Sequence, residues 1–176
     1  ESSVLISGYL ERTIPVNQHI LISQDNIHTL PVSIQIITKS ENGNLLYSGG
    51  DFSGISILSS HIQKKISDNS KIIGNFLKES GYLGIAGIDY LVHDEKILFV
   101  EINPRFQSSS RLLNVNLVEN NLPTLYELHM MAFDNKPISL PDNIKAKGSF
   151  LIANNDGNTR PFFEDHIINF ISPDTR

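Results

Sequence analysis

The sequence predicts an α+β domain in which helices cover one face of a mostly antiparallel sheet. Segments with strand-like alternation follow one another closely, so hairpins are the simplest connection between them. Helical spacing of apolar residues appears at about residues 57–79 and again over Leu122–Phe133. The resulting order, β-β-β-α-β-β-α-β, is typical of an antiparallel sheet with helices packed against it.

The first third of the chain predicts strands joined by turns. These strands are expected at Val4–Leu10 (or a hinge), Ile14–Ser23, Thr29–Thr38 and Leu45–Tyr47. Pro31 cannot donate a ladder hydrogen bond, so we expect its strand to lie at an edge or to begin after it. Ser48–Gly54 (SGGDFSG) predicts a glycine-rich loop in which Asp51 is a turn residue.

The remaining elements are predicted from the spacing of apolar residues and from residues that typically end a helix or strand. The helix over about 57–79 is expected to break near Ser67–Ser70 and to end at Gly81. Two strands follow at about 83–92 and 96–103. The helix Leu122–Phe133 tolerates Pro123 in its first turn. A late strand is expected at Gly148–Ala153.

The stretches GIDYLVH and ILFVEIN predict a hairpin in which two acids face each other. Side chains alternate faces along a strand, so burying the apolar faces places Asp89 opposite Glu101 on the other face. This register assigns Phe99 to the acidic face and Val100 to the core face. It closes the hairpin through a three-residue loop at residues 94–96.

Two carboxylates that face each other across a ladder repel, so a positive group is expected between them. Asp89 and Glu101, with the amide of Asn103, form an oxygen-rich set that suits a hard cation such as Mg²⁺. Arg105 follows a rigid Asn-Pro stop and can grip a phosphate or carboxylate with two hydrogen bonds. The alternative is a solvated hairpin whose acids simply face water, and spacing alone favours it.

Composition limits the functional classes. The chain has 176 residues, a formal net charge of −5 and no cysteine. The acidic balance argues against nucleic-acid binding, and the lack of cysteine excludes disulfides and suits the cytoplasm. No apolar run reaches the roughly 20 residues of a membrane span. We expect a single domain over residues 1–176. Because the chain starts at Glu1, we expect a fragment of a longer protein.

At GIDYLVHDEKILFVEINPRFQSSS the sequence resembles the C-terminal half of the ATP-grasp superfamily, in the branch of carbamoyl phosphate synthetase and biotin carboxylase. The resemblance extends upstream through LLYSGGDFSG and VLISGYLE, and it covers about residues 1–134. Residues 135–176 are then a C-terminal extension, and the family's N-terminal half, with its phosphate-binding lid, is absent.

The resemblance implies an ATP- and Mg²⁺-dependent ligase, with Mn²⁺ as an alternative metal. Such an enzyme activates a carboxylate as an acylphosphate, which an amine or similar nucleophile then attacks. Asp89, Glu101 and Asn103 would be metal residues, and Arg105 would meet the transferred phosphate or the acid. The adenine hinge would fall on Ser7, Gly8, Tyr9 and Leu10, with Glu11 as a nearby substitute for the expected acidic ribose contact.

Two departures from the family pattern keep alternatives open. Ser7 stands where many members carry Glu, and Pro15 stands where the ribose contact is expected. A non-catalytic nucleotide-binding or regulatory module is therefore a second hypothesis, and a structural domain with a solvated acidic face is a third. The implied partners are small carboxylate and amine substrates, and a homodimer is allowed; neither nucleic acid nor membrane is expected.

Overall fold

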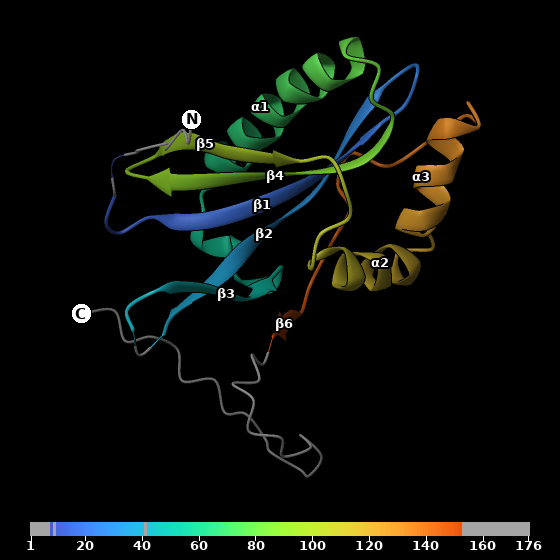
Figure 1. The fold of residues 1–176 in the computed structure, drawn as a ribbon. Coiled ribbons are helices and arrows are strands. Elements are labelled where there is room, and N and C mark those ends of the chain that lie inside the picture. Colours follow the sequence, from blue (N-terminus) through green and yellow to red (C-terminus); the bar gives the residue numbers. More distant parts are fainter. Residues whose placement is uncertain (1–7, 9, 41, 153–176) are drawn as a thin grey trace.

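The computed structural model describes residue 8, residues 10–40 and residues 42–152. Its centre is a six-stranded sheet in the order β5-β4-β1-β2-β3-β6, and every neighbouring pair is antiparallel (Figure 1). The strands are β1 (Ile14–Ile22), β2 (Ile27–Lys39), β3 (Leu45–Asp51), β4 (Gly84–His93), β5 (Lys96–Asn103) and β6 (Ser149–Leu151). The helices are η1 (Ser53–Ile57), α1 (Ser60–Glu79), α2 (Ser110–Glu119) and α3 (Leu125–Phe133). The predicted α+β class and antiparallel sheet are confirmed.

Helices pack on both faces of this sheet, because α1 covers one face and α2 and α3 cover part of the other (Figure 1). The core beneath α1 includes Val16, Ile20, Ile62, Ile66 and Ile88. The core beneath α2 and α3 includes Leu21, Ile85, Leu113, Leu117 and Leu125. Each fully buried side chain of this size contributes about 1.5–3 kcal/mol. Adjacent residues of β1 therefore serve two different cores, which fixes the register of this central strand.

Pro31 lies within β2, which begins at Ile27, so the strand does not start after the proline. β2 as a whole lies between β1 and β3, but β3 pairs with it only from Ile34 onward, so at Pro31 the strand has β1 on one side and no strand on the other. The pairing steps from Gln18↔Val32 to Ile20↔Thr29, so β2 carries one residue more than β1 at this point. Such a bulge leaves a residue unpaired, and a proline without an N–H is tolerated there.

The long helix α1 is unbroken, contrary to the expected interruption near Ser67–Ser70. The two serines of that stretch face the sheet and find partners there, whereas Asp68 is exposed and pairs with Lys64. Ser70 is fully buried with its hydroxyl 2.8 Å from the Tyr90 hydroxyl, and Gln18 Nε2 donates to Ser67 Oγ at 3.0 Å. Serines that look like breakers in the sequence are therefore part of the helix–sheet contact.

Helix α2 was not assigned from the sequence, and α3 begins later than expected. Thr124 caps α3 and forms a capping box with Glu127, so Pro123 precedes the cap instead of lying in the first turn. Ser109 occupies the N-cap position of α2, but its side chain makes no capping hydrogen bond. None of the helices in the described part of the chain combines the length and apolar character that a bilayer span needs.

The hairpin β4–β5 pairs Asp89 with Glu101 as predicted, but its outer half has a different register. A bulge follows this pair, so Tyr90 faces Phe99 where strict alternation would pair it with Val100. Phe99 therefore lies on the α1 side, with its ring centroid 6.3 Å from that of Tyr90, and Val100 moves to the other face. This reverses both predicted assignments.

The hairpin closes through a two-residue turn, not the expected three-residue loop. Asp94 and Glu95 both have positive φ, at 46° and 59°. Two consecutive residues of this kind match a type I′ turn, whose twist suits a tight hairpin. The bulge and the shorter turn compensate each other, which is why the Asp89–Glu101 pair is preserved.

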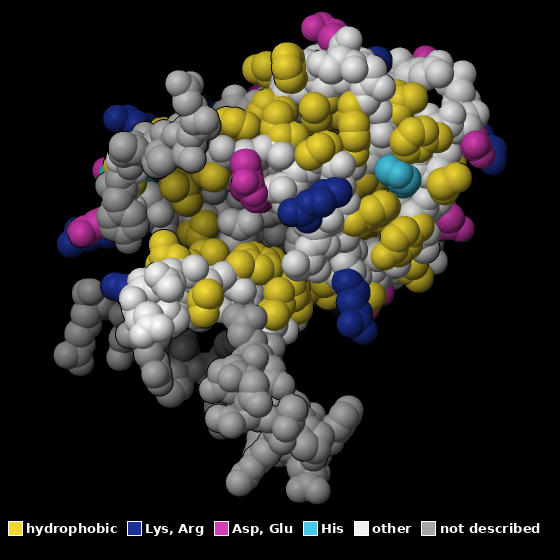
Figure 2. Space-filling model, in the orientation of Figure 1, with side chains coloured by type: hydrophobic (Ala, Val, Ile, Leu, Met, Phe, Trp, Pro, Cys, Tyr) yellow, Lys and Arg dark blue, Asp and Glu magenta, His cyan; other side chains and the backbone are white. Residues whose placement is uncertain are grey.

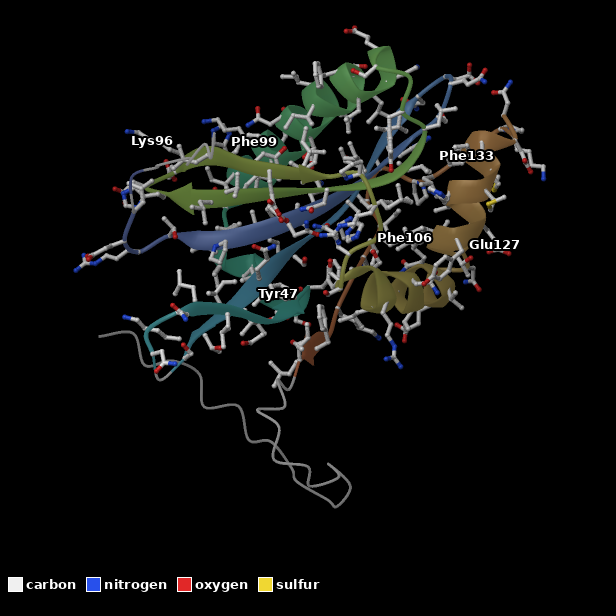
Figure 3. All side chains as sticks on the ribbon, in the orientation of Figure 1. Tyr47, Lys96, Phe99, Phe106, Glu127 and Phe133 are labelled. Carbon is white, nitrogen blue, oxygen red and sulfur yellow. The ribbon has the colours of Figure 1, made fainter. Side chains whose placement is uncertain are left out.

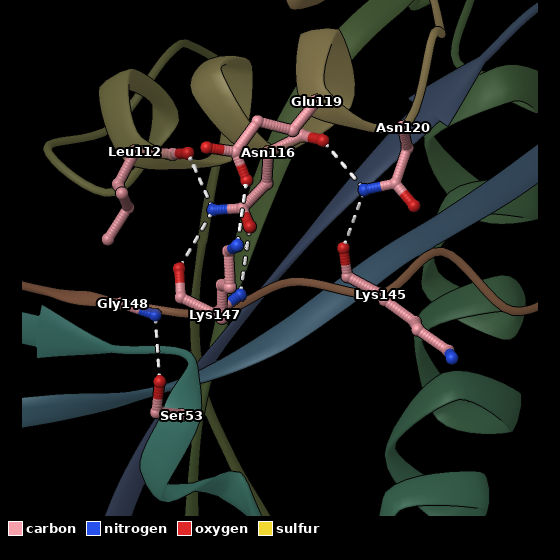
Figure 4. A network of polar contacts seen from close by, with 8 residues as sticks. All are labelled: Ser53, Leu112, Asn116, Glu119, Asn120, Lys145, Lys147 and Gly148. Carbon is pink, nitrogen blue, oxygen red and sulfur yellow. Dashed lines mark hydrogen bonds and ion pairs between the residues drawn. The ribbon is translucent and has the colours of Figure 1, made fainter.

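The segment of residues 135–148 runs back from α3 past α2 toward β6, and side-chain amides of α2 hold it (Figures 1 and 4). Asn116 Nδ2 donates to the Lys147 carbonyl at 3.0 Å, and the Lys147 N–H donates to Asn116 Oδ1 at 2.8 Å. Asn120 Nδ2 donates to the Lys145 carbonyl at 2.8 Å. The first part of the expected C-terminal extension is thus tied to the fold.

β6 adds a short strand beside β3, which explains the glycines of the SGGDFSG loop. A Cβ on Gly49, whose φ is 148°, would collide with the Phe150 carbonyl. Asp51 Oδ1 accepts hydrogen bonds from the Ser53 N–H at 2.7 Å and from Ser149 Oγ at 2.9 Å. Asp51 is the last residue of β3, so it is not a turn residue in a loop as expected, although its side chain accepts from the turn that follows. The expected loop over Ser48–Gly54 is strand as far as Asp51, and its glycines allow the close approach of β6.

Candidate functional site

A pocket of about 540 Å³ lies on the face of the sheet that does not carry α1. Its walls come from β1 to β5 and from the loop between β5 and α2. Tyr47 reaches it from β3, as Figure 3 shows, while the predicted metal residues approach from β4 and β5. Figure 2 shows acidic and basic groups near the centre of this face, with hydrophobic side chains around them.

The structure brings the four predicted residues of the hairpin together in this pocket. Asn103 Nδ2 donates to Asp89 Oδ2 at 3.1 Å and to Glu101 Oε1 at 2.9 Å. Arg105 Nη2 donates to Asn103 Oδ1 at 3.0 Å. The amide of Asn103 therefore links both carboxylates to the guanidinium, and all four groups line one pocket.

The two carboxylates differ in their surroundings. Asp89 is 9% exposed, whereas Glu101 lies open to solvent. Burial raises the pKa of Asp89, and the charge of Glu101 raises it further, although hydrogen bonds from Asn17 and Gln107 oppose the shift. Among the ion pairs of the described residues, neither acid has a cationic partner. The negative charges of the two carboxylates are therefore not neutralised by an ion pair, and a divalent cation bound between them would supply the missing positive charge.

Polar residues that the sequence analysis did not single out surround Asp89. Asn17 Nδ2 donates to Asp89 Oδ1 at 2.6 Å, and Gln35 Nε2 donates to the same oxygen at 3.1 Å. Asn17 Nδ2 also donates to Gln107 Oε1 at 2.7 Å, and Ser109 Oγ donates to Asn17 Oδ1 at 3.2 Å. The sequence indicated a role for Asn17 only weakly, as a polar residue in the alternating strand expected at Ile14–Ser23.

A glycine on β4 makes room for this polar cluster. A Cβ on Gly87 would collide with the side-chain amide of Gln107. Gly87 pairs with Asn103 on one side and His19 on the other, so it has a strand on each side. The missing side chain lets the loop after β5 fold down onto the strands.

The other end of the pocket is apolar. Ile37, Leu45, Leu91 and Val100 line it, together with Tyr47. Burial, and then the charge of Asp89, raise the pKa of Tyr47 to about 12, so its hydroxyl stays protonated at neutral pH. A ligand that carries a flat apolar group at one end and negative charge at the other would match this division of the pocket.

The donor set fits Mg²⁺ in type. It offers two carboxylates and one amide oxygen, and hard divalent cations prefer oxygen. The described residues hold no cluster of three or more His, Cys, Asp or Glu side chains, so Asn103 is needed for a third ligand. Its Nδ2 faces the acids and its Oδ1 faces Arg105, so binding a metal requires the amide to turn over.

Known proteins resemble this chain in sequence and in fold. The family model of the ATP-grasp domain matches residues 3–109, a span that includes the hairpin and Arg105. The chain belongs to the ATP-grasp family. Two curated relatives are formate-dependent phosphoribosylglycinamide formyltransferases of Prochlorococcus marinus, from strains MIT 9312 and AS9601. They are 28% identical over 102 residues and 26% identical over 99 residues.

Solved structures share the ATP-grasp fold. Biotin carboxylase of Campylobacter jejuni, as a β,γ-ATP complex, has a TM-score of 0.61 at 12% identity, and the match covers 80% of this chain and 29% of that one. N5-carboxyaminoimidazole ribonucleotide synthetase of Thermus thermophilus has a TM-score of 0.57 at 16% identity, with coverage of 81% and 35%. The biotin carboxylase domain of Hydrogenobacter thermophilus 2-oxoglutarate carboxylase, crystallised with MgADP, has a TM-score of 0.60 at 13% identity, with coverage of 80% and 29%.

The matches extend over part of each ATP-grasp protein. They cover 58% and 56% of this chain, but only 25% and 24% of the two formyltransferases. In the predicted hinge, Ser7 and Tyr9 lie outside the described residues, and Gly8, Leu10 and Glu11 are exposed. None of these three lines the pocket, where Pro15 is the first contributor among the described residues. The hinge assignment stays a prediction.

Proposed function

We propose that this chain is the nucleotide- and metal-binding part of an ATP- and Mg²⁺-dependent ligase. The enzyme would activate a carboxylate as an acylphosphate for attack by an amine or a similar nucleophile. The observation that carries the proposal is the convergence of Asp89, Glu101, Asn103 and Arg105 in one pocket. Family membership and the MgADP in a structural neighbour support it. We place the protein in the cytoplasm, where ATP is abundant.

The residues of the pocket would divide the work between metal and phosphate. Glu101 is the exposed carboxylate and Asp89 the buried one, so together they can hold a cation between solvent and the strands. Asn103 would add a neutral oxygen. Bound Mg²⁺-ATP would supply the phosphoryl group, and Mg²⁺ would offset its charge. Arg105 would hold the transferred phosphate or the acid through its guanidinium.

The apolar end of the pocket suits the base of the nucleotide. Leu91 and Val100 project from β4 and β5, and Ile37 and Leu45 from β2 and β3. A purine ring placed there would remove apolar surface from water while its phosphates reached the acids. The adenine contact of the hinge residues Ser7 to Leu10, with Glu11, is part of the same proposal.

Metal binding by the chain itself tests this proposal. Mn²⁺ can report on the Mg²⁺ site through its EPR signal, with and without ADP. Glu101→Gln should weaken Mn²⁺ binding by at least about tenfold, since changes even in the outer shell of metal sites cost that much. The same substitution should leave stability unchanged or raise it by roughly a few tenths of a kcal/mol, because it removes like-charge repulsion.

Glu79→Gln is the matched control, because Glu79 is an exposed acid at the end of α1 and does not line the pocket. It should bind Mn²⁺ as the wild type does. Equal Mn²⁺ affinity in the wild type and Glu101→Gln would refute the metal site. For the full-length protein, phosphate release with a panel of acids and amines should fall in the same variant. Binding of Mg²⁺-nucleotide without turnover would instead assign a regulatory module.

A further inference from the structure

Asn17 is the buried centre of the polar cluster behind the proposed metal site. It lies on β1 and is 2% exposed. Its Nδ2 donates to Asp89 Oδ1 at 2.6 Å, to Gln107 Oε1 at 2.7 Å and to the Ile88 carbonyl at 3.2 Å. Its Oδ1 accepts from Ser109 Oγ at 3.2 Å. One side chain therefore connects β1, β4 and the loop between β5 and α2.

The geometry restricts what can occupy this position. The amide nitrogen has two hydrogens for three acceptors, and the two shortest contacts go to Asp89 and Gln107. Asp89 Oδ1 also accepts from Gln35, whereas Oδ2 accepts from Asn103. The Asn17 and Gln35 bonds therefore both go to Oδ1, and Oδ2 is the oxygen that faces the proposed metal residue Asn103.

We infer that Asn17 is a positioning residue, which orients Asp89 for the metal and holds Gln107 against β4. The inference rests on the proposed function of the pocket. A neutral amide can do this without adding charge, whereas a carboxylate at position 17 would place a third negative group in an already acidic cluster. Outer residues that orient metal ligands in this way change affinity without touching the metal.

The neighbouring residue on β1 shows what a purely structural amide does. Gln18 is also 2% exposed, but it faces α1, where its Nε2 donates to the Leu30 carbonyl at 2.8 Å and to Ser67 Oγ at 3.0 Å. It has the same burial and strand as Asn17 but no contact with the pocket of the proposed metal site. Gln18→Ala is therefore a matched control for the loss of a buried amide.

The test compares Asn17→Ala and Gln18→Ala in the same chain. Both should lower the free energy of unfolding, since each leaves buried partners unpaired. Only Asn17→Ala should weaken Mn²⁺ binding, by about 10- to 100-fold. A readout without metal is the position of the Gln107 side-chain amide resonance in NMR spectra. Because Gln107 Oε1 accepts from Asn17, this resonance should shift in Asn17→Ala and stay in place in Gln18→Ala. An unshifted Gln107 resonance, or wild-type Mn²⁺ affinity in Asn17→Ala, would overturn the inference.

A double variant that exchanges the two groups, Asn17→Asp with Asp89→Asn, covers the case in which Asn17→Ala does not fold. It keeps one carboxylate and one amide in contact, so it should be more stable than Asn17→Asp alone. Its Mn²⁺ affinity should stay low, because the carboxylate has moved from β4 to β1. Full recovery of Mn²⁺ affinity would overturn the positioning role. If the wild type itself binds no Mn²⁺, the proposed metal site is wrong. The Gln107 measurement would then still decide whether Asn17 holds Gln107 in place.

Discussion

Acid should destabilise this protein through His19, and replacing that residue should remove part of the effect. His19 is 1% exposed on β1, and burial lowers its pKa from 6.5 to about 4. Its Nε2 lies 2.8 Å from Ser110 Oγ, and its Nδ1 has no partner in the described residues. The folded state therefore holds the neutral imidazole, and protonation favours unfolding.

The sign and size follow from linkage. The folded-state pKa is depressed, so this contribution is fully present above pH 6.5 and is lost as the pH falls toward 4. A shift of that size corresponds to about 3 kcal/mol between neutral pH and pH 4, at 1.36 kcal/mol per unit. Asp89 has a raised pKa, so its ionisation opposes this trend over part of the same range.

Urea unfolding of the wild type and His19→Gln, measured at several pH values from 7 to 4, isolates the His19 effect. The difference between the two curves cancels the contribution of Asp89. Glutamine can reach Ser110 in place of Nε2 but does not titrate, so the stability difference should shift by about 3 kcal/mol in its favour on acidification. His61→Gln, at an exposed site on α1, should leave the slope unchanged. Parallel curves for wild type and His19→Gln would refute the argument that burial keeps His19 neutral.

Two further substitutions test the packing around the site. Gly87→Ala should displace Gln107, which lowers the Mn²⁺ affinity and lowers the stability by about 1–3 kcal/mol. Gly81→Ala is the control: nothing lies near the added Cβ, but φ is 84°, so this variant should lose stability and keep its Mn²⁺ affinity. Wild-type Mn²⁺ affinity in Gly87→Ala would contradict the close packing of Gln107. Asn116→Ala should release the 135–148 segment and lower the free energy of unfolding by about 1–3 kcal/mol. Limited proteolysis should then cut this segment faster than in the wild type. An unchanged rate of cleavage would show that other contacts hold the segment.

The fold class and the acidic pair could be predicted because both depend on local pattern. Alternation along β4 and β5 was enough to bring Asp89 and Glu101 together, since the core must exclude charge. Alternation alone could not show the bulge at Val100, because the extra residue is balanced by a shorter turn at Asp94 and Glu95. Local sequence patterns showed which residues share a strand, but they did not show where a β-bulge shifts the pairing of two strands.

The elements that the sequence analysis missed depend on contacts between distant residues. Pro31 is tolerated within β2 because it lies at a bulge in the pairing with β1 and before the pairing with β3 begins. Ser109 occupies the N-cap position of α2, but its hydroxyl donates to Asn17, which is 92 residues away in the chain. No local pattern records such a pairing, so the amide cluster around Asp89 could be found only from the folded chain.

The bulge in the β4–β5 pairing divides this hairpin into two parts whose side chains serve different faces of the sheet. Toward the tip, Tyr90 and Phe99 pack against each other on the α1 side, whereas beyond the bulge the side chains of Asp89 and Glu101 face the pocket on the other side. Sequence drift near the tip can therefore accumulate, and even change the tip's length, without rotating the acids away from a ligand. Evolution can alter the support of this sheet and its chemistry separately.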